Sequence, residues 1–119
     1  MCGEIALEGY HTATTYGRLN LQQGGIAIFS RDDDFTAPNR INCLSVELHC
    51  EVSAVRLNSH NMTILCFYRS LKEDFKLFLD TSERVFCSLG ISCNVMLCGD
   101  FNVRFNVGDR KAESLCDLI

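Results

Sequence analysis

One segment of the chain most constrains the fold, because it reads as strand, amphipathic helix and strand in that order. The first run, Met62–Tyr68, is apolar and β-branched, and the last run, residues 94–98, is apolar and stops at a glycine. Between them Ser70 precedes Glu73 at capping-box spacing, and Gly90 would end the helix. Between these two end signals, apolar residues recur at helical spacing and would form one face of the helix: Phe75, Phe78, Leu79, Val85, Phe86 and Leu89. This order predicts a crossover connection on a sheet.

Further strand and turn signals precede this unit. Residues 52–57 form a second β-branched run, joined to the 62–68 run by the turn formers of 58–61, which predicts a hairpin. A glycine pair leads into an apolar run over residues 26–30, which predicts another strand. Apolar and polar residues alternate over 44–48, the period of a half-buried strand.

Loops and a last helix complete the expected elements. The acidic run 31–34 is expected to be a solvated loop. We expect no clear strand before Gly9 and Tyr10. After Gly108, Asp109 would cap a helix whose apolar positions are Ala112, Leu115, Cys116 and Ile119.

Composition sets the scale of the protein. The 119 residues, 47% of them hydrophobic, suffice for one modest domain over residues 1–119. With a net charge of −4, the chain lacks the excess of positive charge that is typical of non-specific DNA binding. No apolar stretch approaches the roughly 20 residues that cross a bilayer, so no membrane association is expected.

The cysteines indicate a reducing compartment. Eight of them are present, with no CxxC pair and no early apolar signal segment, so we expect reduced thiols and an intracellular location, cytoplasmic or nuclear. Cys66 and Cys98 lie inside apolar runs, where a free cysteine is expected to act as a small hydrophobe.

The candidate site follows the last predicted strand, where Gly99 is followed by Asp100, Phe101 and Asn102. An extended backbone sends residues i and i+2 to one face, so Asp100 and Asn102 are expected to point together off the end of a buried strand. Gly99 would keep the approach open. Ligands of open α/β sheets collect at this end of the strands. The alternative is an ordinary turn, which aspartate and asparagine favour.

Three motifs in order carry a resemblance: residues 24–28 (Gly-Gly-Ile-Ala-Ile), 67–70 (Phe-Tyr-Arg-Ser) and 98–102 (Cys-Gly-Asp-Phe-Asn). On these the chain resembles the endonuclease/exonuclease/phosphatase superfamily, and more narrowly the apurinic/apyrimidinic-type endonuclease domain of jockey-like non-LTR retrotransposons. The resemblance implies an α+β fold, part of a four-layer sandwich of two mixed sheets with outer helices. It also implies Mg²⁺- or Mn²⁺-dependent phosphodiester cleavage, with DNA as the partner.

The resemblance also implies roles for individual residues. Asp100 would orient or deprotonate the attacking water, and Asn102 would hold the phosphate or lie beside the metal, so both are candidate metal ligands. The hydroxyl group of Tyr68 would donate to a phosphate oxygen. Arg69 is a candidate phosphate contact, with an exposed solubilising arginine as the alternative.

Several groups that the resemblance calls for are not found. Glu4 and Glu8 lie too close to Gly9 and Tyr10 to be the early acidic metal ligand, and the late aspartate and Ser-Asp-His motif would lie beyond Ile119. We therefore expect an incomplete domain, cut at both ends and inactive by itself. Two alternatives stay open: a non-catalytic interaction module that binds a protein or self-associates through an unfinished sheet, and a divergent superfamily phosphatase acting on a phosphoinositide or nucleotide.

Overall fold

The computed structural model describes residues 6–18, 24–70, 74–89, 94–103 and 110–118. These residues form an α+β arrangement, as the sequence predicts. The elements run in the order β1 (His11–Gly17), β2 (Gly25–Ser30), β3 (Phe35–Thr36), α1 (Asn39–Asn42), β4 (Glu51–Leu57), β5 (Met62–Tyr68), α2 (Phe75–Leu89), β6 (Asn94–Asp100) and α3 (Arg110–Leu118).

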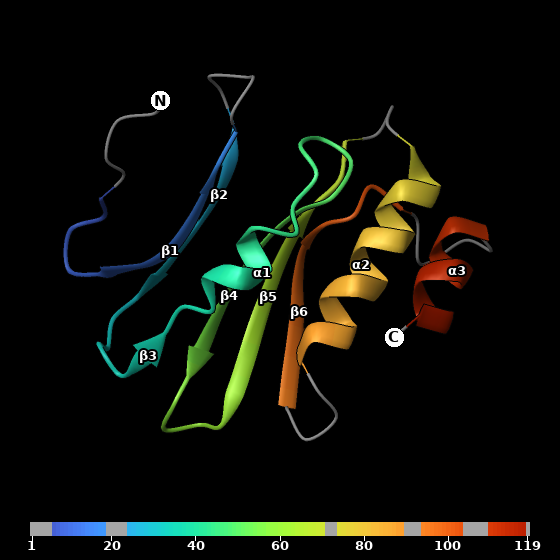
Figure 1. The fold of residues 1–119 in the computed structure, drawn as a ribbon. Helices are drawn as coiled ribbons and strands as arrows, with labels where there is room; N and C mark the ends of the chain where they lie inside the picture. Colours follow the sequence, from blue (N-terminus) through green and yellow to red (C-terminus); the bar gives the residue numbers. More distant parts are fainter. Residues whose placement is uncertain (1–5, 19–23, 71–73, 90–93, 104–109, 119) are drawn as a thin grey trace.

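Two sheets carry the fold (Figure 1). The larger has the order β3-β4-β5-β6 and is mixed, because β4 is antiparallel to its neighbours while β5 and β6 are parallel. The predicted hairpin is therefore confirmed as β4–β5, and the predicted crossover as β5–α2–β6. The smaller sheet, β1–β2, is purely antiparallel rather than mixed, and it packs against β4.

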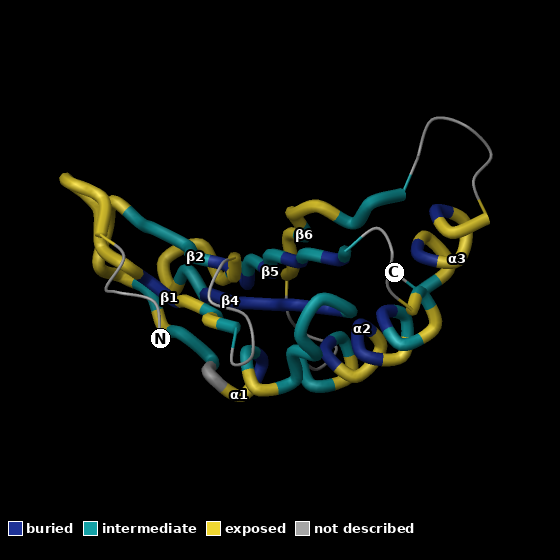
Figure 2. Tube along the Cα trace, turned by 90° about the horizontal axis from the view of Figure 1, so that it is seen from above, coloured by how far each residue is buried: buried dark blue, intermediate teal, exposed yellow. Residues whose placement is uncertain are grey.

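Helices α1 and α2 lie on the same side of the four-stranded sheet (Figure 2). An aromatic cluster fills the space beneath α2: the ring of Phe67 on β5 lies 6.3 Å from that of Phe78 and 5.7 Å from that of Phe101. Leu115 brings α3 into the same core. Burial of such large side chains contributes roughly 1.5–3 kcal/mol each and supplies the main driving force for this layer.

Two expected elements differ from the structure. Residues 44–48 are not a strand: they belong to a tight loop, in which the backbones of Val46 and Cys50 exchange hydrogen bonds of 2.9 Å. Ser45 holds this loop, since its Oγ accepts from the Val52 amide and donates to the Val52 carbonyl, both at 2.9 Å. The alternation of apolar and polar residues over 44–48 therefore belongs to a loop and not to a strand. In addition, β1 is a strand that the sequence did not predict.

The start of α2 is also capped differently from the prediction. Asp74 Oδ1 accepts hydrogen bonds from the amides of Lys76 (2.9 Å) and Leu77 (3.3 Å), which is N-cap geometry. Of the expected capping box, Glu73 lies outside the described residues, and the Ser70 amide donates to the Leu48 carbonyl at 2.8 Å. Gly90, Gly108, Asp109 and Ile119 also lie outside them, while the described parts of α2 and α3 agree with the expected helices.

The last strand, β6, is exposed and not buried as expected. It forms the edge of the larger sheet, and only Leu97 of its residues is even half-buried. Val95 and Met96 keep 39% and 49% of their surface in water. The sequence of β6 is as apolar as that of a central strand, but no described element covers its face opposite α2 (Figure 2).

Candidate functional site

The candidate site is built on one row of residues across three neighbouring strands. Tyr68 pairs with Glu51 across the antiparallel β4–β5 ladder and with Asp100 across the parallel β5–β6 ladder. Register partners project from the same face of a sheet, so these three side chains lie in line. The row coincides with the carboxyl ends of β5 and β6, where open α/β sheets collect ligands.

Asp100 and Asn102 lie close together, although not by the predicted strand alternation. Strand β6 ends at Asp100, and Asn102 has a φ of +52°, so the backbone is no longer extended there. Asp100 Oδ1 instead accepts the Asn102 amide at 3.1 Å, a local turn of the kind that both residue types favour. The Asn102 side-chain amide donates to the Arg69 carbonyl, which ties the turn to the end of β5.

Arg69 is fully buried, so its reading as an exposed solubilising arginine is wrong. Its guanidinium donates to the carbonyls of Phe101 (2.9 Å), Asn102 (2.7 Å) and Ser70 (3.4 Å). The same group lies 5.0 Å from the centre of the Phe75 ring. In this position Arg69 joins the ends of β5 and β6 to α2 and offers no exposed surface to a phosphate.

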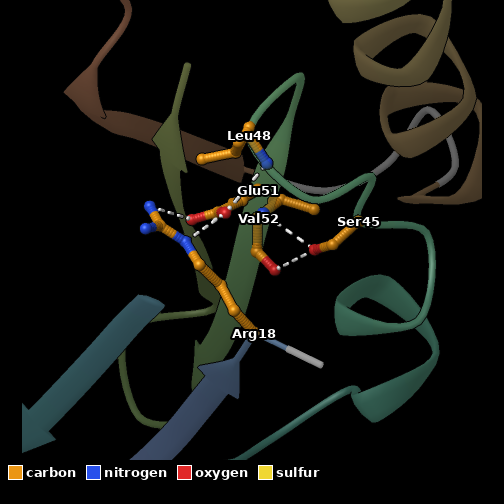
Figure 3. Close-up of polar contacts among 5 residues, drawn as sticks. All are labelled: Arg18, Ser45, Leu48, Glu51 and Val52. Carbon is orange, nitrogen blue, oxygen red and sulfur yellow. Dashed lines mark hydrogen bonds and ion pairs between the residues drawn. The ribbon is translucent and has the colours of Figure 1, made fainter. Parts of the chain in front are cut away.

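Tyr68 ends β5, as predicted, and has a cationic neighbour that the sequence did not indicate. The guanidinium of Arg18, just past the end of β1, lies 5.4 Å from the centre of the Tyr68 ring. Arg18 also forms a bidentate ion pair with Glu51, with distances of 2.6 Å from Nε to Oε2 and 3.1 Å from Nη2 to Oε1 (Figure 3). The hydrogen bond to Glu51 is the main cause that raises the pKa of Arg18.

Glu51 is a buried carboxylate whose oxygens are already engaged. Its side chain is 0% exposed, and besides Arg18 it accepts the amide of Leu48 at 3.0 Å (Figure 3). Leu48 has a φ of +69°, a backbone region that bulky residues rarely adopt, so Glu51 supports a strained loop. Burial, followed by the negative charge of Glu51, raises the pKa of nearby Tyr16.

Sequence reasoning missed both members of this ion pair. A signal for Glu51 was present, because a lone glutamate in the run Cys50-Glu51-Val52 must be paired if the run is buried. No comparable signal identified Arg18, since its partner is 33 positions away in sequence.

The row offers few ligands to a divalent cation. Mg²⁺ usually takes one or two carboxylates together with substrate phosphates. Glu51 is occupied by Arg18 and Leu48, and one oxygen of Asp100 accepts the Asn102 amide. Within the described ranges, no group of three or more histidine, cysteine, aspartate and glutamate side chains could hold a metal ion. These residues therefore do not fit a resident Mg²⁺ or Mn²⁺ ion by themselves.

Other parts of the described surface do not add to the site. A pocket lies at the opposite end of the sheet, beside the β4–β5 turn, and its lining includes Arg40, Arg56 and Thr63. His49 accepts the Asp74 amide through Nδ1 at the start of α2. No helix in the described part of the chain is long and apolar enough to cross a membrane.

Comparison with known proteins adds no relative to this description. No family model matches the chain, and neither a curated protein nor a solved structure matches it.

Proposed function

We propose that this chain is part of a metal-dependent phosphodiesterase domain of the endonuclease/exonuclease/phosphatase type, derived from a retrotransposon DNA endonuclease. One observation carries the proposal: the parallel β5–β6 pair brings Tyr68 and Asp100 into register at the carboxyl ends of their strands. Asn102 is tied to Asp100 beside them. A hydroxyl, a carboxylate and an amide at this edge match the three roles that the sequence motifs imply.

Each group has a chemical task in this proposal. Asp100 is exposed, so its carboxylate is accessible to orient a water molecule toward a phosphorus atom. The Tyr68 hydroxyl donates a hydrogen bond to a phosphate oxygen. Arg18 beside the Tyr68 ring has no direct part, because its charge is compensated by the ion pair with Glu51. Arg69 has no direct part, because its guanidinium is buried.

Under this proposal, the chain by itself does not hydrolyse phosphodiesters. The described residues of the row supply one accessible carboxylate, which is too little to hold Mg²⁺ or Mn²⁺ and to activate water together. Further ligands and a general base would have to come from another segment or chain. With Tyr68, Asp100 and Asn102 alone, the chain contacts a phosphate but does not hydrolyse the phosphodiester.

The direct test is binding of a fluorescent DNA duplex, measured by anisotropy with and without Mg²⁺ or Mn²⁺. We expect weak binding that strengthens with the divalent cation, because added cations reduce the repulsion between the Asp100 carboxylate and the DNA phosphates. Asp100→Asn should abolish this cation-dependent gain, whereas Asp33→Asn, a change at an exposed loop carboxylate, should not. An equal response of the two variants would contradict the proposal.

Cleavage is tested separately with supercoiled plasmid under the same cations. Wild-type chain should nick no faster than Asp100→Ala. Robust nicking that disappears in Asp100→Ala would overturn the inactivity and keep the site assignment, while nicking that survives the substitution would place the chemistry elsewhere.

A non-catalytic interaction module is the second candidate function, and the exposed edge strand favours it. Val95 is 39% exposed on β6, which ends the larger sheet, and a flat apolar edge can pair with another strand. The partner tested for this edge is a second copy of the chain. Sedimentation equilibrium should then reveal a dimer that Val95→Lys dissociates and that changes little with salt. A monomer at all concentrations would exclude this function.

A further inference from the structure

The face of β5 and β6 opposite α2 carries two cysteines side by side. Cys66 and Cys98 are register partners in the parallel ladder, so they project from the same face. Cys98 Sγ donates to the Leu65 carbonyl oxygen at 3.5 Å, on the residue that precedes Cys66 in β5. Both thiols are free, Cys98 is exposed and Cys66 is half-buried. The exposure of Cys98 shows that it is not the small core hydrophobe that its apolar surroundings predict.

A third sulfur lies on the same face. Met96 precedes Cys98 by two positions on β6, and alternation along a strand directs both side chains to one side of the sheet. Met96 is 49% exposed, so its side chain is accessible from solvent. Its register partner is Ile64, the position two residues before Cys66 on β5. Two thiols and a thioether are therefore gathered on a surface open to solvent.

The chemistry of these three groups selects the ion. Thiolate and thioether sulfur are soft ligands that favour Cu(I), whereas carboxylate, carbonyl and water suit Mg²⁺ and Mn²⁺. Structural zinc sites require four ligands from cysteine, histidine or carboxylate groups, and no cluster of even three of these occurs among the residues that the structure describes. Two cysteines and a methionine supply enough ligands for a monovalent ion of low coordination number.

We propose that Cys66, Cys98 and Met96 form a binding site for Cu(I). On binding, the ion displaces one proton from each thiol and accepts a lone pair from each resulting thiolate and from the Met96 thioether. Nothing is oxidised or reduced, and the two protons pass to solvent. The site is independent of the phosphodiesterase proposal, because it uses no group of the Glu51–Tyr68–Asp100 row.

The test uses the full chain with its other cysteines removed, except for Cys50. The chain has eight cysteines, so Cys2, Cys43, Cys87, Cys93 and Cys116 are replaced by serine, and buried Cys50 is kept. Cu(I) is then titrated without oxygen against the chelator bathocuproine disulfonate, and circular dichroism checks that each variant folds. We expect one Cu(I) per chain to resist the chelator, with X-ray absorption reporting sulfur ligands alone.

Substitutions assign the ligands. Cys66→Ser and Cys98→Ser should each weaken binding by more than roughly 100-fold, the upper end of what loss of an outer-shell partner causes. Met96→Leu, which keeps volume and apolar character, should weaken binding about tenfold. Met62→Leu is the matched control, because Met62 shares the face but lies four positions from Cys66.

Three results would overturn the proposal. One is copper retention by the Cys66→Ser Cys98→Ser double variant, and another is an equal effect of Met96→Leu and Met62→Leu. The third is complete loss of copper to the chelator while hydrogen peroxide readily joins Cys66 to Cys98, which would identify a redox pair in place of a metal site.

Discussion

At the scale of single residues, Gly99 illustrates how closely the candidate site is packed. Its φ is +133°, and a Cβ atom there would lie 2.0 Å from the Phe67 carbonyl oxygen. The sequence suggested that this glycine keeps an approach open to a ligand, but what approaches it is the backbone of β5.

We therefore predict that Gly99→Ala destabilises the fold by about 1–3 kcal/mol, since both the backbone conformation and the contact with Phe67 must change. Urea unfolding followed by circular dichroism measures this loss. Gly17→Ala is the matched control, because nothing lies within 4 Å of a Cβ at that strand position, and a shift within about 0.5 kcal/mol is expected. Equal stability of the two variants would contradict the role of Gly99.

A buried thiol makes stability depend on alkaline pH. Burial raises the pKa of Cys50 to about 11, with the negative charge of Glu51 adding to the effect and a hydrogen bond with Ser82 opposing it. The unfolded thiol ionises at lower pH, so between its ordinary pKa and about 11 the unfolded state releases a proton that the folded state retains. The contribution of the Cys50 thiol to the free energy of unfolding is therefore full below that pH window, and it falls as the pH rises through the window.

We expect urea midpoints to fall between about pH 8 and about pH 10, and Cys50→Ala to make the fall shallower although it lowers stability at neutral pH. Cys87→Ala, at an exposed helix position, should leave the slope as it is. Parallel pH profiles for wild type and Cys50→Ala would exclude Cys50 as a source of the dependence.

At the scale of elements, Arg69 is the contact that holds the end of the crossover unit together. Its guanidinium reaches the carbonyls that follow β5 and β6 and lies near the Phe75 and Phe78 rings of α2. Its own amide donates to the Asp100 carbonyl at 3.0 Å. Removing the side chain would leave the partly buried carbonyls that follow β5 and β6 without these donors.

Arg69→Met should accordingly cost at least about 3 kcal/mol, given roughly 1–3 kcal/mol for each buried group left unsatisfied. Arg69→Lys should recover only part of this, because an ammonium group lacks the planar fork. The matched control is Arg84→Met, at an exposed position of α2. A thermal transition of Arg69→Met as high as that of Arg84→Met would refute the bridging role.

Prediction from sequence worked for the hairpin, α2 and β6, and failed for residues 44–48, whose alternation belongs to a loop, and for β1. The hairpin, α2 and β6 have clear apolar periodicity, and all three are present. Strand β1 was missed because a register shift between Thr12 and Thr14 breaks its alternation and because threonines supply most of its β character. Burial of Glu51 and Arg69 depends on partners distant in sequence, which no local pattern encodes.

At the scale of the whole molecule, the Arg18–Glu51 ion pair joins the two sheets. Arg18 follows β1 of the smaller sheet, Glu51 begins β4 of the larger one, and their side chains are 12% and 0% exposed. A second link is the 3.1 Å hydrogen bond between the hydroxyls of Thr14 and Ser53. Breaking one partner of a buried pair leaves a charge without compensation.

We predict that Glu51→Leu and Arg18→Met each destabilise the chain by about 3–5 kcal/mol, and that the double variant loses much less than their sum. A double-mutant cycle in urea measures the coupling. For comparison, Asp80→Ala breaks the exposed Lys76–Asp80 pair and should cost no more than about 0.5 kcal/mol. Additive losses in the Arg18–Glu51 cycle would show that the pair does not couple the sheets.

The crossover between β5 and β6 has a consequence for biosynthesis. Strands β4 and β5 are joined by a short turn and can pair as soon as both have left the ribosome, whereas β6 is made only after the whole of α2. During that interval the nascent chain presents the unpaired edge of β5 and the apolar surface that α2 later covers. The edge of β5 therefore stays open to other strands for as long as synthesis of α2 and β6 takes.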